Sequence, residues 1–414
     1  MTFEIKPGKV TVYIGSHKLV ALEGNAEREE PSILRYASLK NPEGFDGGLV
    51  SNLEKAAESL ENLMTLFDKD WRIKNLRPFV VLGNRKLKTY EFSSSQYYQG
   101  LERTISPQEI RSVVAQTRSV ATLPLSEFIL QAIPESFLVN DTYNIRNPLG
   151  LEAYRLGVTL KLYTMSFQDF KNLSKTFESA ELEVAGYFPK TLTVSESVLN
   201  EEEKDEGALL IDVADDGIYL VLWNEGRLVG TRMLEIGGRF LSGQIAGQWG
   251  IEPHDARKVK ERYGSLNLNS DFGEELIPLV ERNGKGNCQV RRRDFHAKFL
   301  EQAGGWLAEL LKQCDSFLAE NRSSHPQYIF TGGGVAFDGF LEFFQKYSNQ
   351  EARIGLPRKI EAATELLVDP SMNGALGMYR WFSLHMPERE KFFAPKGFFE
   401  KTIFSAREWF SAYF

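Results

Sequence analysis

Three glycine-bearing turns follow runs of β-forming residues, at Gly15-Ser16, at Gly217 and at Gly332-Gly333-Gly334. Glycine has no Cβ, so its backbone can turn tightly and approach a ligand closely. The last turn also precedes a helical pattern at 340–344, and a strand, a glycine turn and a helix together place backbone N–H groups beside whatever a cleft holds. The turns therefore predict a ligand site, unless the glycines serve only the tight turns themselves.

The first two turns belong to segments of similar design, 9–24 and 208–226, which lie about 200 residues apart. Each consists of an apolar run, a polar turn and a returning β-rich run, which is typical of a β-hairpin. Helical patterns follow both hairpins, and one of them, the charged run 253–263, ends at Gly264. This repetition predicts a duplicated α/β architecture.

Between the two hairpins, the segment 84–161 has an organisation of its own. A capping box, in which Ser106 is followed by Glu109 with Pro107 at the first helical position, predicts the start of a helix. The run 154–164 then has the composition of a returning strand. We therefore expect a small inserted α/β subdomain.

Composition sets limits on the function. The chain has 414 residues, of which 42% are hydrophobic and 25% charged, as in a folded protein with more than one domain. Its formal net charge of -7 argues against nucleic acid as a partner. Two cysteines cannot form a disulfide framework, no histidine cluster has zinc-ligand spacing, and no apolar run of about 18 residues could span a bilayer. These features predict a cytoplasmic protein with no resident metal.

The last segment of the chain, 398–414, follows an expected linker at 387–397 and has an amphipathic pattern of helical period. Because aromatic rings favour the boundary between water and lipid, the segment predicts a helix that lies on a membrane surface. Packing against the protein's own body is the alternative role of such a last helix. The residues expected to enter the lipid are Phe398, Phe399, Ile403, Phe404, Trp409, Phe410, Tyr413 and Phe414.

Several motifs resemble, in order and spacing, those of the bacterial division protein family FtsA. They lie at 13–18, 47–54, 133–137, 146–151, 236–238 and 331–334. The resemblance covers nearly the whole chain. It implies an α/β fold of the actin-like (ribonuclease H-like, duplicated) type with an inserted α/β subdomain 1C. It also implies self-association into filaments and a link between the tubulin-like protein FtsZ and the inner face of the cell membrane.

The resemblance also implies boundaries and partners. Subdomain 1A is expected at 1–83, 163–195 and 365–386, the inserted subdomain 1C at 84–162, subdomain 2A at 196–240 and 300–364, and subdomain 2B at 241–299. Arg291, Arg292 and Arg293 open a long helix and resemble a basic patch that meets the acidic C-terminal tail peptide of FtsZ, although a solvated charge run is the alternative. Other division proteins and membrane lipid complete the expected partners of a peripheral membrane protein.

The implied nucleotide site departs from the family pattern. The residues that match positions for ATP with Mg²⁺ are Gly15, Ser16, Lys18, Asp212, Lys260, Gly332, Gly333 and Gly334. Tyr13 replaces an aspartate, Arg257 replaces a glutamate, and Asp215 and Asp216 stand where the family has glycines. A contact between like charges at about 4 Å costs about 4 kcal/mol at an effective dielectric of about 20. This energy corresponds to a loss of roughly a thousandfold in affinity. We therefore expect ATP binding to be weak or lost, while Mg²⁺ that screens the acidic turn would leave a low affinity.

Three other functions stay open from the sequence. An ATP-binding FtsA paralogue could serve a different partner. A pilus-assembly adaptor resembling PilM would share the fold and the insertion but would carry no membrane helix of its own. An ATPase or kinase of the same superfamily would need an intact aspartate in the first turn and a positioned general base, and the sequence identifies neither. We therefore expect no enzyme activity.

Overall fold

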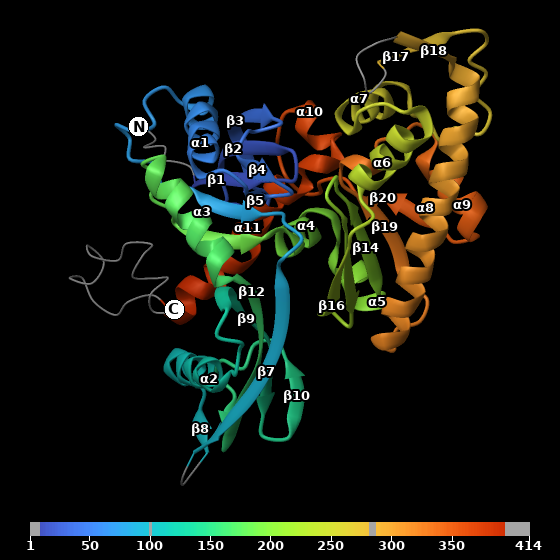
Figure 1. Ribbon diagram of the computed structural model, residues 1–414. Helices are drawn as coiled ribbons and strands as arrows, with labels where there is room; N and C mark the ends of the chain where they lie inside the picture. Colours follow the sequence, from blue (N-terminus) through green and yellow to red (C-terminus); the bar gives the residue numbers. More distant parts are fainter. Residues whose placement is uncertain (1–8, 99–101, 281–286, 394–414) are drawn as a thin grey trace. The chain divides into compact units, whose positions relative to one another are not determined.

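The computed structural model describes residues 9–98, 102–280 and 287–393. The chain forms two compact units (Figure 1). Among the described residues, the first contains 9–197, Lys359–Ala363 and 374–393, and the second contains Val198–Arg358 and Thr364–Asn373. Neither unit is continuous in sequence, so long-range packing, and not chain order, defines each of them.

The first unit is built on a mixed sheet in the order β13-β6-β1-β2-β3. Its strands are β1 (Lys9–Ile14), β2 (Lys18–Asn25), β3 (Ser32–Lys40), β6 (Phe79–Leu82) and β13 (Gly186–Pro189). β1, β2 and β3 are antiparallel, whereas β6 runs parallel to both β1 and β13. A short hairpin, β4 (Phe45–Asp46) and β5 (Leu49–Val50), precedes the first helix.

Helices cover both faces of this sheet. They are α1 (Leu53–Phe67), α3 (Phe167–Ser179), α4 (Lys190–Val198) and α11 (Asn373–Phe393). On one face Val12 packs in the core that α1 and α3 share, and on the other face Thr11 contacts Tyr379 of α11. Because side chains alternate along a strand, β1 is buried on both sides.

An antiparallel sheet in the order β10-β9-β12-β7 is inserted between β6 and α3. Its strands are β7 (Lys88–Tyr97), β9 (Glu127–Val139), β10 (Thr142–Ile145) and β12 (Arg155–Ser166), and β8 (Arg103–Thr104) pairs separately with β11 (Glu152–Ala153). Helix α2 (Pro107–Val120) covers one face, where Val113 packs in one core with Leu160. The capping box predicted at Ser106 and Glu109 begins this helix and is confirmed.

The second unit repeats the plan of the first, with a sheet in the order β16-β15-β14-β19-β20. Its strands are β14 (Ala208–Val213), β15 (Ile218–Asn224), β16 (Arg227–Leu234), β19 (Gln327–Thr331) and β20 (Ala352–Ile354). As in the first unit, three antiparallel strands are followed across the sheet by two parallel ones. The predicted duplicated α/β architecture is confirmed.

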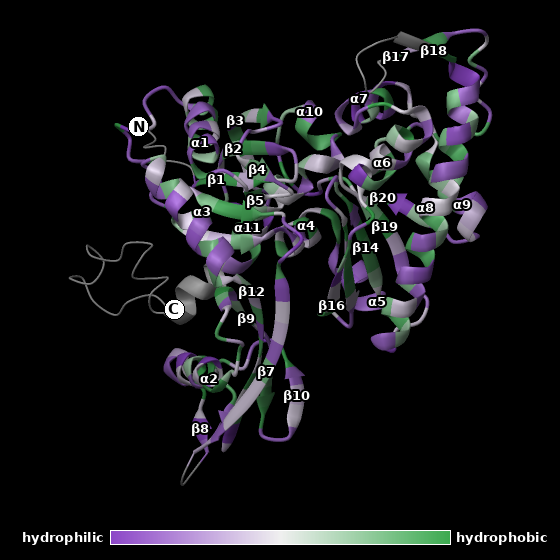
Figure 2. Cartoon of the chain, in the orientation of Figure 1, coloured by the Kyte–Doolittle hydropathy of each residue, from purple (hydrophilic) through white to green (hydrophobic). Residues whose placement is uncertain are grey.

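The helices of the second unit surround this sheet and carry an additional hairpin. They are α5 (Glu201–Glu206), α6 (Gly238–Trp249), α7 (Pro253–Tyr263), α8 (Arg292–Glu320), α9 (Phe340–Ser348) and α10 (Thr364–Leu367), with the hairpin β17 (Leu276–Val280) and β18 (Asn287–Arg291). Trp306, Phe330 and Phe344 join α8 and α9 to the sheet in one hydrophobic core. Figure 2 shows hydrophobic residues in inner strands such as β14 and hydrophilic residues along much of β7.

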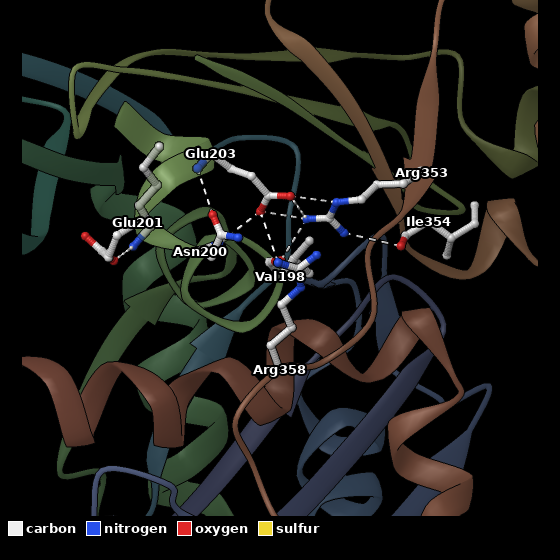
Figure 3. A network of polar contacts seen from close by, with 8 residues as sticks. Val198, Asn200, Glu201, Glu203, Arg353, Ile354 and Arg358 are labelled. Carbon is white, nitrogen blue, oxygen red and sulfur yellow. Dashed lines mark hydrogen bonds and ion pairs between the residues drawn. The ribbon is translucent and has the colours of Figure 1, made fainter. Parts of the chain in front are cut away.

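An ion-pair network fixes the start of α5 to β20 within the second unit (Figure 3). Arg353 donates two hydrogen bonds of 2.8 Å to the Glu203 carboxylate and one of 3.1 Å to the Val198 carbonyl. Glu203 also accepts from the Asn200 backbone N–H at 2.9 Å, which closes a capping box. The Glu203 side chain is only 10% exposed, so removal of Arg353 would leave a largely buried charge.

Two expectations about the end of the chain are corrected. Helix α11 continues to Phe393, so it passes Pro387, where the sequence predicted a linker at 387–397. A proline removes one helical hydrogen bond, but the residues after it, 388–391, are strong helix formers. Thr364–Asn373 packs with the second unit, whereas the expected subdomain 1A included 365–386.

The expected membrane helix, 398–414, lies outside the described residues, as do residues 394–397 of the expected linker. Within the part of the chain that the structure describes, no helix combines the length and the apolar character needed to cross a membrane.

Candidate functional site

The first glycine turn joins β1 to β2 in the first unit. The Gly15 N–H donates to the Lys18 carbonyl at 2.9 Å, and the Gly83 N–H donates to the Ile14 carbonyl, also at 2.9 Å. Lys18 is buried and Ser16 is half-buried. Three of the predicted site residues, Gly15, Ser16 and Lys18, therefore lie together at one hairpin turn.

The ring of Tyr13 fills the space beside this turn, and the residue is only 4% exposed. A methyl group added at Gly15 would lie 2.9 Å from the ring, and one at Gly374 would lie 3.1 Å from it. At Gly83, an added methyl group would lie 3.3 Å from the Tyr13 hydroxyl oxygen. Three glycines thus make room for an aromatic side chain, at a turn whose glycines were expected to admit a phosphate.

The second glycine turn joins β14 to β15 and packs against the start of α6. Ala214 donates its N–H to the Gly217 carbonyl at 2.9 Å, and the Gly238 N–H donates to the Ala214 carbonyl at 2.9 Å. A methyl group at Gly237 would lie 2.4 Å from the Gly217 nitrogen, which leaves no room for a side chain there. The Gly237-Gly238 motif therefore serves the close approach of α6 to the turn.

The Asp215 carboxylate of this turn is buried among cations. Arg257 of α7 forms an ion pair with it, and Arg239 Nε of α6 lies 3.6 Å from it. A methyl group at Gly238 would lie 3.1 Å from Lys260 Nζ and 3.3 Å from Asp215 Oδ1, so both side chains border this glycine. The repulsion expected from the sequence assumed an isolated carboxylate, whereas in the structure Arg257 neutralises it.

Lys260 is the most deeply buried of these cations, at 5% exposure. Its ammonium group donates to the Gly238 carbonyl at 2.6 Å. Burial lowers the pKa of Lys260 to about 8, because the charged form loses its hydration, and the Asp215 carboxylate opposes this effect only in part. Lys260 therefore links α7 to the start of α6 by a hydrogen bond.

Asp212 and the Gly332-Gly333-Gly334 loop also meet within the second unit, at the ends of the parallel strands β14 and β19. Asp212 is 1% exposed, and a methyl group at Gly332, where φ is 88°, would lie 2.5 Å from its Oδ1 atom. A methyl group at Gly334 would lie 2.3 Å from Val213 Cγ1. The glycines thus allow the loop to pack directly on β14, so part of their role is steric.

Neighbouring acidic and polar groups are also engaged. The Tyr219 hydroxyl donates to the buried Asp216 carboxylate at 2.9 Å. Asn373 Nδ2 donates to Thr331 Oγ1 at 2.6 Å and to the Gly355 carbonyl at 2.8 Å, which fixes the strand end before the glycine loop.

Sequence reasoning missed two residues of the second unit's site. Arg239 directly follows the Gly237-Gly238 motif, but that position by itself does not show which group the arginine meets. Asn373, far from Thr331 in the chain, gave no signal.

These side chains fit a magnesium–nucleotide complex poorly. Tyr13 occupies the space beside the first turn, where the family pattern has an aspartate. At the second turn, Asp215 takes up the cations that would otherwise face a phosphate. Asp212 and Lys260 remain, but Lys260 donates to a backbone carbonyl.

The expected partner patch lies at the start of α8, and its arginines already have acidic partners in the described residues. Arg292 pairs with Glu275 at 2.6 Å, and Arg293 pairs with Glu274 at 2.9 Å. Arg291 pairs with Asp294 at 2.9 Å. An acidic peptide bound there would compete with these carboxylates.

Comparison with known proteins first defines the class. A family model described as "SHS2 domain inserted in FTSA" matches residues 91–164, within the inserted β7–β12 segment. The PilM-PilN type IV pilus biogenesis complex shares the fold with a TM-score of 0.63 at 16% identity, covering 91% of this chain and 98% of that chain. MreB5 of Spiroplasma citri bound to ADP gives a TM-score of 0.51 at 11% identity, covering 95% and 100%. The chain is an actin-like protein with an inserted SHS2 domain.

Relatives in sequence then narrow the class to one family. The cell division protein FtsA of Escherichia coli (strain K12) is 23% identical over 386 residues, which cover 90% of this chain and 89% of the relative. FtsA of Borreliella burgdorferi (strain B31) is 25% identical over 352 residues, covering 84% and 83%. Together with the SHS2 match, these similarities place the FtsA proteins among the relatives of this chain. The resemblance read from the sequence motifs and the expected actin-like fold are confirmed.

Proposed function

We propose that this chain is a membrane-tethered, filament-forming adaptor of cell division that anchors FtsZ to the inner face of the cell membrane and binds ATP weakly or not at all. The observation that carries the proposal is the SHS2 insertion, which interrupts an actin-like unit between β6 and α3. Actin-like folds host several functions, so the insertion and the FtsA relatives, more than the fold, support a division role.

The direct test is electron microscopy of the purified protein on lipid monolayers, with and without Mg-ATP. We expect filaments on the lipid in both conditions. Many membrane helices along one filament bind by avidity, so filament formation and lipid binding should reinforce each other. A protein that stayed monomeric on the lipid would contradict the proposal.

The ATP part of the proposal rests on Tyr13 at the first turn and on Asp215 at the second. Because Tyr13 fills the space beside the first turn and Asp215 holds the cations beside the second, we expect calorimetry of the full chain with Mg-ATP to give no measurable heat of binding, and no turnover. A dissociation constant in the micromolar range would overturn this part.

The membrane part rests on the amphipathic sequence 398–414, which carries few basic residues. Insertion must then come from apolar burial, which contributes about 1.5–3 kcal/mol for each large side chain. Deletion of residues 397–414 should abolish pelleting with liposomes, whereas Lys401→Gln, which removes a charge but little apolar area, should leave it intact. Unchanged pelleting after the deletion would remove the membrane helix from the proposal.

The FtsZ part rests on the arginines at the start of α8. Charge reversal at Arg292 and Arg293 should abolish binding of an FtsZ tail peptide, measured by fluorescence anisotropy. Glu274→Gln with Glu275→Gln is the matched control: it frees the same arginines from their partners and should tighten binding. Peptide affinity that survived the charge reversal would count against this surface.

A pilus-assembly adaptor is the second candidate, because the PilM-PilN complex matches 91% of this chain. At 16% identity this likeness concerns the fold alone. Such an adaptor is expected to need a partner to reach the membrane. Liposome pelleting by the purified chain therefore separates the two candidates.

A further inference from the structure

We infer that the Asp215 carboxylate is a tethered replacement for a phosphate: it occupies an anion site formed by Arg239, Arg257 and Lys260, and its removal would open that site to a phosphate-bearing anion. The inference rests on one part of the proposed function, that the second turn is a former phosphate turn. It goes further by naming the Asp215 carboxylate as the group that replaces the phosphate.

The cations of this site come from two helices and converge on one carboxylate. Arg257 of α7 pairs directly with Asp215, and Arg239 of α6 lies 3.6 Å from it. Lys260, also of α7, borders the same glycine as Asp215 Oδ1. Glu261 lies 3.8 Å from Arg257 but is 60% exposed, so solvent screens it. Two arginines thus lie within 4 Å of one buried carboxylate, and Lys260 lies close by with its ammonium group on the Gly238 carbonyl.

The backbone around Asp215 fixes the position of its carboxylate. The turn that carries it is closed by the bond from Ala214 to Gly217, and the Arg239 N–H donates to the Asp215 carbonyl at 2.8 Å. These bonds fix the backbone of Asp215, so its carboxylate starts from a fixed position beside the cations. Because it belongs to the same chain, its local concentration exceeds that of any free ligand.

The substitutions at the two positions are complementary. The pattern implied by the FtsA resemblance has a glycine at position 215 and a glutamate at position 257, whereas this chain has Asp215 and Arg257. Either change alone would leave its charge without its direct ion-pair partner in a largely buried site, which is unfavourable. Together they form an ion pair, so the turn is held in a ligand-bound arrangement without a ligand. The expected absence of ATP dependence follows from this occupation, and not from repulsion.

The test is anion rescue of the full-length Asp215→Ala variant, with Asp215→Asn as a second variant of conserved shape. Thermal unfolding and calorimetry are measured with sodium pyrophosphate and with sodium acetate, at constant ionic strength in chloride. We expect both variants to melt below the wild type. Pyrophosphate should raise the melting temperature of the variants but not that of the wild type, with affinity at least about tenfold above the wild type's.

Two further variants make the outcome specific. Asp216→Ala removes the neighbouring buried carboxylate, which pairs with Tyr219, and should be destabilised without rescue by either anion. The double variant Asp215→Ala, Arg257→Ala should lose the rescue, because the main cation is gone. Rescue that was absent from both Asp215 variants, or equal in Asp216→Ala, would overturn the inference. That failure is distinct from failure of the proposed function, which Mg-ATP calorimetry on the wild type decides.

Discussion

The pH dependence of stability at Lys260 provides a quantitative prediction. Burial lowers the pKa of Lys260 to about 8 in the folded chain from its ordinary value of 10.5. Between these two values the unfolded chain holds a proton that the folded chain does not. The free energy of unfolding must therefore rise with pH across this window, since stability rises wherever the unfolded state binds more protons.

The size of this effect follows from the shift. One pKa unit corresponds to about 1.4 kcal/mol, so the contribution of Lys260 to the free energy of unfolding should grow by about 3 kcal/mol between pH 8 and pH 10.5. Below pH 8 Lys260 is charged in the folded chain, so its burial lowers the free energy of unfolding by the full amount. Lys260→Met removes the titrating group and with it the pH dependence, although it also loses the bond to the Gly238 carbonyl.

The assay is urea unfolding of the wild type and of Lys260→Met, followed by tryptophan fluorescence at several pH values from 7 to 10.5. The difference in unfolding free energy should change by about 3 kcal/mol in favour of the wild type as the pH rises. Lys258→Met on the same helix is the matched control, because Lys258 is 64% exposed, and its difference from the wild type should stay flat. Parallel curves for the wild type and Lys260→Met would refute the reasoning.

Two further predictions concern close packing and buried charge. Arg353→Met leaves the Glu203 carboxylate largely buried without its main partner and should lower the free energy of unfolding by about 3–5 kcal/mol, measured in urea; a loss below about 1 kcal/mol would contradict the role given to this pair. Gly377→Ala would place a methyl group 1.8 Å from the Thr193 carbonyl oxygen, so α11 or α4 must shift and the melting temperature should fall. Gly243→Ala in α6, where nothing lies within 4 Å, is its control and should gain up to about 1 kcal/mol; equal effects at the two glycines would argue against the close helix contact.

Much of the fold was predictable because its signals are local. The charged run 253–263 became α7 with the same bounds, since Pro253 begins a helix and Gly264 follows its end. The capping box at Ser106 began α2, and the two hairpins became the centres of two sheets with the same strand order. The linker predicted at 387–397 was wrong, because the prediction gave the proline more weight than the helix formers at 388–391 that follow it.

The candidate site was only partly predictable. The sequence showed that Tyr13, Asp215 and Arg257 break the nucleotide pattern, and it gave a reason in like-charge repulsion. It treated Asp215 and Arg257 as two separate losses, whereas the structure joins them in an ion pair. Arg239 was missed, because an arginine after a glycine motif has no fixed meaning until the helix that carries it is placed.

By itself the sequence determined which segments become hairpins and helices and where the insertion lies, because turns, caps and periodic patterns act between residues a few positions apart. Only the tertiary structure decided what the altered residues do. The energy of a buried charge or a buried ring depends on the groups that surround it in space. For Asp215 those groups come from α6 and α7, and for Tyr13 they include Gly83 and Gly374, which are distant in the chain.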